Sequence, residues 1–487
     1  MKNIKDVVSN VKRPIKVVQF GEGNFLRAFV DWQIDIMNEK AGFNGNVALV
    51  QPLGRGMGEM INEQNGLYTT VLRGVMNGET VADFRQITSV ERCVNPYEQF
   101  DEYMALSTLD TVRFVISNTT EAGIAYNPKD KKDDKPQSSF PGKVTAFLYN
   151  RYKHFNGALD KGIIFIPCEL IDKNGDNLKK YVLQYAKEWN LEAEFTAWIE
   201  NACDFCNSLV DRIVPGYPRA EVDSLQAALG YQDNLLDAAE IFHLWVIECH
   251  NKTHEDELPT VQAGLNVVWT DDMSFYRTRK VRILNGAHTM TVLASHAYGL
   301  DTVEECTKDP IVSRFMKDGI FNEIIPSMDG DKEQLEYYTN AVLERFQNPY
   351  IKHFLLSISL NSTSKFKTRD LPSLLGYYQK NRKLPTHLCF ALAALMNFYK
   401  GTEIVDGALI GHRGDEEYKI SDSPEVLETF KKIYSENLPV AKTVLGQSEW
   451  WGQDLNEVPG LTELVDKYLT LINEKGMKEA LKEVVNG

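Results

Sequence analysis

Residues 15–29, IKVVQFGEGNFLRAF, decide the fold class. The first six residues show little alternation between apolar and polar side chains and are mostly β-branched or aromatic, which is typical of a buried strand. Two glycines separated by one residue follow directly, and the apolar residues after them open a helix. Glycines in such a strand-to-helix turn let a pyrophosphate approach the helix N-terminus closely. The stretch predicts a dinucleotide-binding unit, and the residues expected to contact the cofactor are Gly21, Gly23, Asn24 and Phe25.

The pattern is incomplete, because Leu26 stands where the usual fingerprint has a third glycine. Its position at the first strand-to-helix junction favours the cofactor interpretation over a purely structural turn. The second strand, residues 47–50, ends at Gln51 rather than at the acidic residue that usually binds the adenosine ribose. Arg55 lies just beyond and could meet a 2′-phosphate, so the strand end leaves NAD and NADP open.

Further apolar runs predict strands at residues 66–73, 111–117 and 163–167. Polar residues 118–123 come directly after the second of these runs, where open α/β sheets place their ligands. We expect Thr120 and Glu121 to contact the cofactor. The alternative is an Asn- and Thr-rich turn that caps a helix.

Length and composition bound the function. A chain of 487 residues should form two or three domains, and 25% charged residues with 43% hydrophobic ones are ordinary for a globular protein. The net charge of −15 argues against nucleic acid and anionic membranes as partners. Seven cysteines suit a reducing compartment, and no run approaches the ~18 apolar residues of a membrane span. With no signal peptide at the N-terminus, we expect a cytoplasmic protein.

The spacing of the apolar residues changes beyond residue 275. From Asp309 onward the apolar residues recur mostly at helical spacing, while residues 403–418 are rich in glycine and charge and carry no strand prediction. The predicted fold class is therefore α/β. A Rossmann-like dinucleotide-binding domain at residues 1–275 precedes a mostly α-helical substrate and catalytic domain at residues 276–487.

Residues 279–289, RKVRILNGAHT, predict an apolar helix that nevertheless carries Lys280, Asn285 and His288. At roughly 100° per residue, these three side chains share one half of the circumference. Burial generally moves a lysine pKa toward the range useful for proton transfer. The alternative is a helix end with a solvated lysine and two satisfied core polar groups.

The pattern Lys-x4-Asn-x2-His resembles the signature of the mannitol dehydrogenase family, and Gly-x-Gly-x-Phe-x-Arg-Ala and Val-Asp-Arg-Ile at residues 210–213 resemble it too. The resemblance implies an NAD-linked oxidoreductase that works without a metal. It implies Lys280 as the proton donor and acceptor, Asn285 as a hydrogen-bond donor to the reacting oxygen, and His288 as a ligand of a neighbouring hydroxyl. It also implies that Asp211 lies near the substrate, although Asp211 and Arg212 could instead form a buried structural ion pair.

Two positions depart from the polyol-oxidising members. Their Cys-Asp-Asn strand end reads Cys-Glu-Leu here, so Glu169 keeps the acid as an expected substrate or cofactor contact while the asparagine is lost. Lys365 matches the family's substrate lysine, but Ser357 occupies the position of the substrate arginine. Arg369 is an additional cation, and we expect it to clamp a carboxylate; a solvated charged face is the alternative.

The resemblance is strongest to the members that reduce keto-uronates. It implies NADH-dependent reduction of D-tagaturonate to D-altronate in hexuronate catabolism, with a small keto-uronate or aldonate as the partner. Reduction of fructuronate to D-mannonate and a mannitol-type reduction of a 2-ketohexose are the enzymatic alternatives. A non-catalytic dinucleotide-binding sensor is the alternative from another class, and the complete Lys280, Asn285 and His288 set argues against it.

Overall fold

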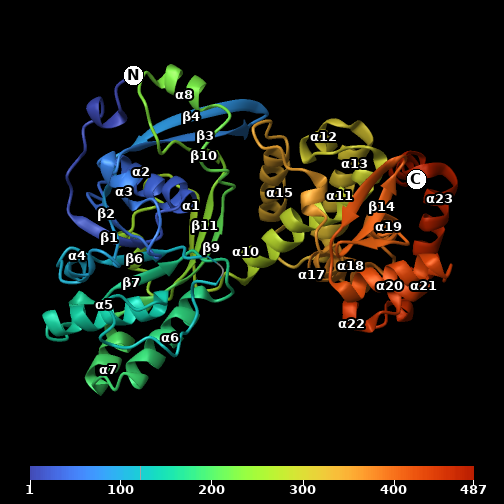
Figure 1. The fold of residues 1–487 in the computed structure, drawn as a ribbon. Helices are drawn as coiled ribbons and strands as arrows, with labels where there is room; N and C mark the ends of the chain where they lie inside the picture. The colour runs from blue at the N-terminus through green and yellow to red at the C-terminus, as the bar shows by residue number, and fades with distance from the viewer. Residues whose placement is uncertain (121) are drawn as a thin grey trace. The chain divides into compact units, whose positions relative to one another are not determined.

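The chain forms two compact units, described by a computed structural model for residues 1–120 and 122–487 (Figure 1). Unit 1 comprises Met1–Arg73 and Thr80–Met273, and unit 2 comprises Gly74–Glu79 and Ser274–Gly487. In the described parts of the chain, no helix combines the length and the apolar character that crossing a membrane requires.

Unit 1 is built on a six-stranded parallel sheet with the strand order β5-β2-β1-β6-β7-β8. Its strands are β1 (Ile15–Phe20), β2 (Asn46–Val50), β5 (Val90–Val94), β6 (Phe114–Ser117), β7 (Ile164–Pro167) and β8 (Asp204–Phe205). The order reverses between β1 and β6. In open α/β sheets such a switch point is where ligands bind, beyond the carboxyl ends of the strands. The predicted Rossmann-like architecture is confirmed.

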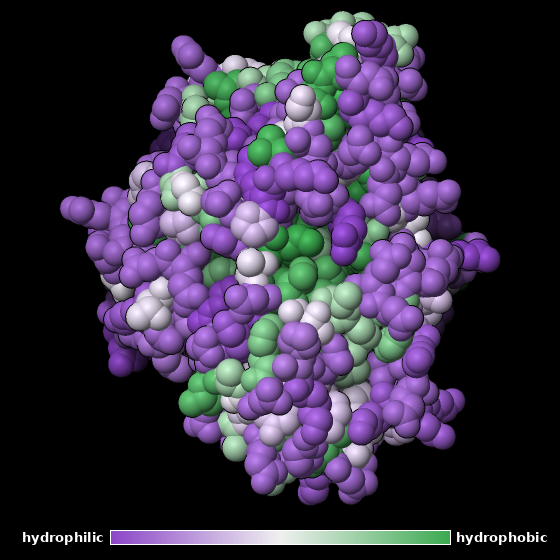
Figure 2. Space-filling view, turned by 90° about the vertical axis from the view of Figure 1, so that its left-hand side faces the viewer, coloured by the Kyte–Doolittle hydropathy of each residue, from purple (hydrophilic) through white to green (hydrophobic). Residues whose placement is uncertain are grey.

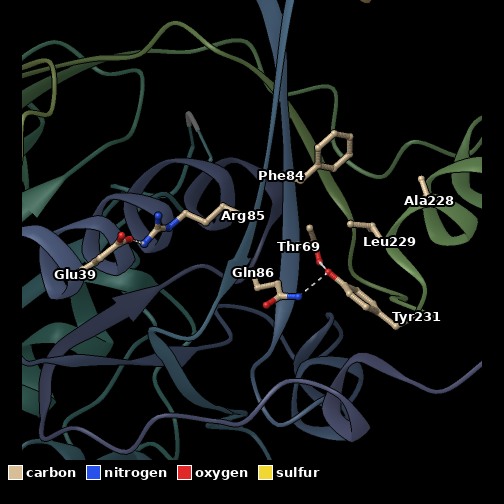
Figure 3. Close-up of a pocket in the computed structure, with 8 residues that line it drawn as sticks. All are labelled: Glu39, Thr69, Phe84, Arg85, Gln86, Ala228, Leu229 and Tyr231. Carbon is tan, nitrogen blue, oxygen red and sulfur yellow. Dashed lines mark hydrogen bonds and ion pairs between the residues drawn. The ribbon is translucent and has the colours of Figure 1, made fainter.

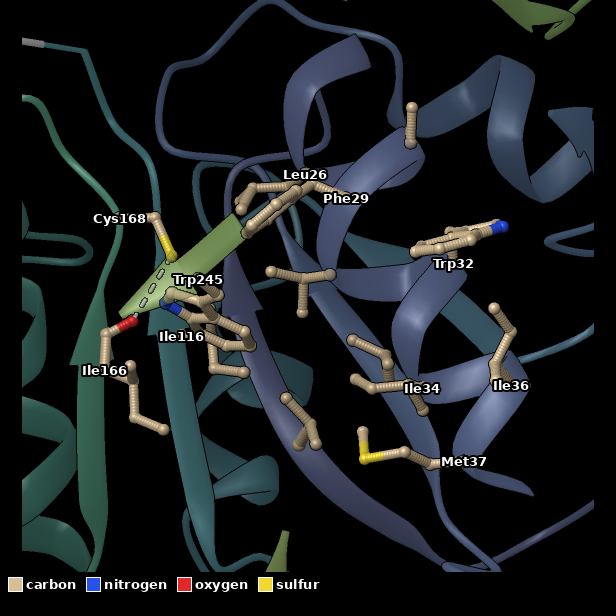
Figure 4. Close-up of a cluster of buried hydrophobic side chains, with 14 of the residues drawn as sticks. Leu26, Phe29, Trp32, Ile34, Ile36, Met37, Ile116, Ile166, Cys168 and Trp245 are labelled. Carbon is tan, nitrogen blue, oxygen red and sulfur yellow. Dashed lines mark hydrogen bonds between the residues drawn. The ribbon is translucent and has the colours of Figure 1, made fainter. Parts of the chain in front are cut away.

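Both faces of this sheet are buried, which explains why its strands are apolar at successive positions. Val18 and Phe20 of β1 belong to one apolar cluster, with helices α5 (Phe140–His154) and α6 (Asn174–Glu188), whereas Val17 belongs to another. On that second face, Phe29 contacts Trp245 of β11 (Leu244–Glu248), with 5.7 Å between the ring centroids (Figure 4).

The helix after β1 is continuous but contains one wide turn. It comprises α1 (Asn24–Leu26), the π-turn η2 (Arg27–Asp31) and α2 (Trp32–Lys40). The fully buried Arg27 donates from Nη2 to Asn24 Oδ1 at 2.7 Å and from Nη1 to the carbonyl of Leu235 at 2.8 Å. The arginine of the family motif therefore ties the first turn of the helix to the segment before β10 (Asp237–Glu240).

Two small sheets complete unit 1. One has the order β10-β3-β4, and the other has the order β12-β11-β9. Their remaining strands are β3 (Tyr68–Met76), β4 (Glu79–Ile87), β9 (Asn207–Asp211) and β12 (Val267–Thr270). On the face shown in Figure 2 the surface is hydrophilic over most of its area, and apolar residues gather near the middle.

A charged network centred on the buried His254 joins three segments of unit 1. Its Nε2 lies 2.5 Å from Asp204 Oδ2 and its Nδ1 lies 3.1 Å from Glu257 Oε1, while Arg113 holds both oxygens of Glu257. Burial alone would lower the pKa of His254, but the two carboxylates outweigh burial and raise the pKa to about 9. Burial would raise the pKa of Glu257, but its bonds to His254 and Arg113 lower it to about 2.

We expect His254→Gln to lower the free energy of unfolding by about 1–3 kcal/mol near pH 6, since charged hydrogen bonds contribute on that scale. The folded pKa of His254 lies above its usual value of 6.5, so its contribution is complete below pH 6.5 and is lost as the pH rises through about 9. Urea unfolding of both proteins between pH 6 and pH 9.5 measures this. A difference that stays constant over that range would contradict the charged-histidine interpretation.

Unit 2 is largely helical, as predicted. Its main helices are α10 (Ser274–Arg279), α11 (Gly286–Tyr298), α13 (Pro310–Gly319), α15 (Lys332–Phe346), α17 (Ser362–Arg369), α18 (Leu371–Asn381), α19 (Thr386–Phe398), α20 (Pro424–Ser435) and α23 (Leu461–Asn486). Helix α11 is buried at every residue from Gly286 to His296, and it packs against α19.

Residues 403–418, for which the sequence analysis predicts no strand, depart from the helical character of the unit. They contribute most of a three-stranded antiparallel sheet, β13 (Ile404–Val405), β14 (Ala408–Arg413) and β15 (Glu416–Ile420). Asp406 and Gly407 have φ of +51° and +78°, and Gly414 has φ of +63°. Two tight turns thus fold this segment into short strands, in which a few apolar residues such as Leu409 are buried and the rest is largely polar, without the regular apolar alternation that marks a strand in the sequence.

Candidate functional site

The two glycines of the turn after β1 differ in their surroundings: the fold requires a glycine at one position and leaves empty space at the other. Gly21 has φ of +120°, and a Cβ atom there would lie 2.8 Å from the carbonyl oxygen of Asn118. Gly23 is exposed and caps the N-terminus of α1, and a Cβ atom there would meet nothing within 4 Å. Open space beside a helix N-terminus is what the pyrophosphate of a dinucleotide requires, so these residues fit the cofactor.

Asn24 and Phe25 occupy the first turn of the helix. The side-chain oxygen of Asn24 accepts the hydrogen bond from Arg27, and Phe25 is half-buried and stacks on Phe29 with 5.1 Å between ring centroids. Both positions are therefore held by the fold next to Gly23, and Phe25 keeps part of its ring exposed.

We expect Gly23→Val to raise the dissociation constant of NADH roughly tenfold or more, because the side chain would occupy the open space at the helix N-terminus. The fold should tolerate it, since nothing lies within 4 Å of the added Cβ. Gly21→Ala is the contrasting variant, because its clash with Asn118 should also lower the melting temperature, which Gly23→Val should leave unchanged. Fluorescence titration with NADH and thermal unfolding measure both effects, and unchanged affinity in Gly23→Val would make the turn structural only.

The loop after β6 is shaped by Glu169 and by one strained residue. Buried Glu169 accepts from Ser117 Oγ at 3.0 Å through Oε2, and from the backbone N–H and Oγ1 of Thr119 at 2.9 Å each through Oε1. Thr120 has φ of +78°, which is unusual for a β-branched residue and typical of functional sites. Burial raises the pKa of Glu169. The predicted contact at Glu121 lies outside the described residues.

The end of β2 does not distinguish NAD from NADP. Gln51 is buried; its side-chain oxygen accepts from the backbone N–H of Gly58 at 3.2 Å, and its amide donates to the carbonyl of Leu53 at 2.7 Å. Arg55 is exposed. Gln51, at the position that usually carries the ribose-binding acid, therefore stabilises the loop that follows β2.

Asp211 is the buried last residue of β9, and Arg212 follows it. Arg212 donates to the carbonyls of Ala28, Ile241 and Phe242 at 2.6, 3.1 and 3.1 Å, and its guanidinium lies 4.1 Å from the ring of Trp32. Arg212 is thus committed to the packing of unit 1, which favours a structural role over a substrate contact.

Lys280 and Asn285 lie on a π-turn, η4 (Lys280–Asn285), rather than on the regular α-helix that the sequence pattern predicts. The backbone N–H of Gly286 points to the carbonyls of Ile283 and Val281, the second of which lies five residues earlier. In an α-helix residues five apart are separated by about 140° around the axis, and the wider turn reduces that separation. The π-turn therefore brings the two half-buried side chains closer to one face, immediately before His288 in α11.

The junction of α17 and α18 packs closely on the start of α11. A Cβ atom at Gly286 would lie 2.8 Å from Asp370 Oδ1, and Arg369 donates from Nη1 to Thr289 Oγ1 at 3.2 Å. Asp370 is fully buried, and neither of its carboxylate oxygens has a hydrogen-bond partner among the described residues. Burial raises the pKa of Asp370 well above its usual value, although Arg369 and Arg282 oppose the effect.

His288 lies among basic side chains, and we call the set the basic cluster: His288, Arg345, His353, Lys365 and Arg369. The imidazole stacks on Phe346 at 4.3 Å between centroids and meets the ring of His353 edge-on at 5.1 Å. Burial, followed by the charges of the four other members of the cluster, lowers the pKa of His288 well below its usual value. Its Nε2 is buried without a hydrogen-bond partner among the described residues.

The structure therefore brings together three predicted residues, His288, Lys365 and Arg369, and adds two that the sequence analysis missed. Arg345 lies in the last turn of α15, and His353 precedes the short helix α16 (Leu355–Ile358). Neither carries a local motif, so only their packing against His288 identifies them. Lys365 is half-buried and donates to the carbonyl of Ile358 at 2.7 Å. The cluster can attract an anion, and the neutral imidazole can bind a hydroxyl.

A separate cavity of about 460 Å³ in unit 1 includes none of the predicted site residues. Figure 3 shows its polar groups paired with one another: Tyr231 meets Thr69 and Gln86, and Arg85 meets Glu39. Across the described residues, no group of three or more His, Cys, Asp or Glu side chains is arranged to hold a metal ion.

Comparison with known proteins identifies the family to which the chain belongs. Residues 15–260 match the mannitol dehydrogenase Rossmann domain, and residues 272–472 match the mannitol dehydrogenase C-terminal domain. The chain is 47% identical over 474 residues to the altronate oxidoreductase of Bacillus subtilis (strain 168), which covers 96% of this chain and 95% of the relative. It is 47% identical over 479 residues to the altronate oxidoreductase of Enterobacter sp. (strain 638), with 97% of each covered.

Two solved structures share the fold over almost the whole chain. A substrate-free D-sorbitol dehydrogenase has a TM-score of 0.79 at 23% identity and covers 99% of this chain and 100% of its own. The Pseudomonas fluorescens mannitol 2-dehydrogenase in a ternary complex with NAD and D-mannitol has a TM-score of 0.66 at 21% identity, with 98% and 95% covered. The matched domains and the extent of the identity establish that this chain belongs to the mannitol dehydrogenase family.

Proposed function

We propose that this protein is an NADH-linked altronate oxidoreductase, which reduces D-tagaturonate to D-altronate and catalyses the reverse reaction. The observation that carries the proposal is the basic cluster around His288. A protein with a net charge of −15 needs such a local excess of cations to hold an acidic sugar. The 47% identity to altronate oxidoreductases over nearly the full length supports the same substrate.

The residues of the π-turn carry the proton chemistry in this proposal. Bound NADH supplies the hydride. Lys280 donates a proton to the oxygen of the reacting carbonyl as negative charge develops on it, and accepts that proton in the oxidation direction. Asn285 donates a side-chain hydrogen bond to the same oxygen, which stabilises the developing charge. No metal ion takes part in the proposed reaction.

His288 and the cations around it orient the substrate. The neutral imidazole of His288 has a buried Nε2 without a partner, and a substrate hydroxyl would satisfy it. Lys365 and Arg369 pair with the carboxylate, for which the planar fork of Arg369 offers two parallel hydrogen bonds. Arg345 and His353 line the same cluster, and Arg345 adds to the positive potential. Burial and the charge of Lys365 lower the pKa of His353, so its ring offers hydrogen bonds rather than charge.

Unit 1 holds the cofactor in this proposal. The residues that we assign to NADH are Gly21, Gly23, Asn24, Phe25, Thr120 and Glu121. Glu169 positions the loop that carries Thr120 through its bonds to Ser117 and Thr119, and its predicted contact with substrate stays a prediction. Asp211 remains a proposed substrate-side residue. The preference for NAD over NADP rests on the resemblance alone.

A steady-state panel of D-tagaturonate, D-fructuronate and D-fructose tests the substrate, with NADH and NADPH compared and absorbance followed at 340 nm. We expect the highest kcat/KM for tagaturonate with NADH. A higher value for fructuronate would assign the protein as a fructuronate reductase, and a higher value for fructose would remove the role of the basic cluster. If neither cofactor is oxidised with any of the three substrates, the non-catalytic dinucleotide-binding sensor becomes the better assignment.

A further inference from the structure

A second basic cavity lies in unit 2, at the opposite end of α11 from His288. It measures about 420 Å³, which is within the range of small-molecule sites. Its polar lining includes His296, Asn397, Lys400, His412, Arg413 and Asn473. No aspartate or glutamate is among the described residues that line it. A cavity with several basic groups and no acid is unexpected in a chain whose net charge is −15.

The arginine and the lysine of this cavity differ in whether a carboxylate pairs with them. Arg413 donates from Nη1 to Asp301 at 2.7 Å and from Nη2 to Glu416 at 2.8 Å, so its charge is compensated. Lys400 lies 3.4 Å from Asn473 Oδ1 through Nζ and has no carboxylate partner among the described residues. Lys400 therefore provides the uncompensated charge, and Arg413 fixes the turn between β14 and β15.

His296 supplies the second observation. Its side chain is only 3% exposed, it meets Tyr418 edge-on at 4.7 Å between centroids, and its Nδ1 is buried without a hydrogen-bond partner among the described residues. Burial and the charge of Arg413 lower its pKa to about 4. The ring is neutral at physiological pH, so it offers one N–H donor and one acceptor nitrogen.

The remaining walls are suited to an organic ligand rather than to a bare ion. Asn397 and Asn473 present side-chain amides, while Ile472 and Met477 present apolar surface. Gly476, with φ of +76° and ψ of +161°, interrupts the helical geometry of α23 between Asn473 and Met477. The break lies where α23 forms the wall of the cavity.

We propose that this cavity binds a small hydroxylated organic anion, either a sugar acid or a sugar phosphate, at a site separate from the basic cluster. Lys400 pairs with the anionic group, and His296 and the two asparagines hydrogen-bond the hydroxyl groups. His296 follows His288 by eight residues on one helix, which corresponds to roughly 12 Å along its axis. More than two turns of α11 therefore separate the histidine of the basic cluster from the histidine of this cavity.

Titration calorimetry on the full chain tests the proposal with D-gluconate, glucose 6-phosphate, orthophosphate and sorbitol. We expect one or both organic anions to bind more tightly than orthophosphate and sorbitol. Tighter gluconate binding would identify a sugar acid as the ligand class, and tighter glucose 6-phosphate binding would identify a sugar phosphate. Equal affinity for sorbitol would overturn the role of the charge, and equal affinity for orthophosphate would leave an adventitious ion only.

Three variants separate this site from the proposed active site. Lys400→Ala should weaken binding of the preferred anion at least roughly tenfold, while kcat/KM for tagaturonate changes less than about twofold. Lys365→Ala should lower kcat/KM for tagaturonate and leave the affinity for that anion nearly unchanged. Lys467→Ala, an exposed lysine on α23 outside the cavity lining, should change neither. Unchanged anion affinity in Lys400→Ala would overturn the proposal, whatever reaction the enzyme catalyses.

Discussion

Lys280→Ala is expected to lower kcat by about 10²- to 10⁴-fold, because general acid–base groups typically contribute that much. Lys280 is half-buried on the π-turn with Asn285, and no other lysine belongs to that turn. NADH binding should survive, since every residue that we assign to the cofactor belongs to the other unit. Steady-state kinetics at saturating substrate, with NADH titration by fluorescence, measures both quantities.

Lys317→Ala is a matched control for this prediction, since Lys317 is an exposed lysine on α13 of the same unit. Partial recovery of Lys280→Ala by added primary amines would support proton transfer, because a merely structural lysine would not be replaced in that way. Near-normal turnover of Lys280→Ala would remove the residue from the mechanism and leave Asn285 and His288 as binding groups only.

Arg369→Ala is expected to lower kcat/KM for tagaturonate by about 30-fold to several thousand-fold, which corresponds to losing a partner for a desolvated charge at roughly 2–5 kcal/mol. The same substitution should change kcat/KM for fructose little, because fructose has no carboxylate. The guanidinium is half-buried and is held toward α11 by its bond to Thr289. Burial lowers the pKa of Arg369, and Asp370 opposes the shift.

The neighbour Asp370 makes a stability control necessary, since Arg369 is one of two cations that act on its buried carboxyl group. Arg369→Lys keeps the charge and loses the fork, and it should recover stability but only part of the substrate discrimination. Lys367→Ala, two residues away on α17, is the matched surface variant, since its Nζ only approaches the carbonyl of Glu449 at 3.4 Å. Equal losses on tagaturonate and fructose would make Arg369 structural and direct attention to Arg345.

The sequence by itself determined the class of each unit. Residues 15–29 predict the strand, the glycine turn and the helix because the apolar run, the two glycines and the helix-forming residues after them are local features of the sequence. The helical character of unit 2 follows from local periodicity in the same way. Lys280, Asn285 and His288 also stood out locally, as polar residues in an apolar run.

Only the tertiary structure decided the surroundings of those residues. Arg345 and His353 reach His288 from segments about 60 residues further along the chain, and no local pattern encodes such packing. Arg27, part of the recognised motif, bonds to the carbonyl of Leu235 and is thus committed to the fold. Local sequence sets backbone preference and the spacing of polar groups. The electrostatic environment of a side chain depends on which distant segments pack around it, and that is decided only when the whole unit folds.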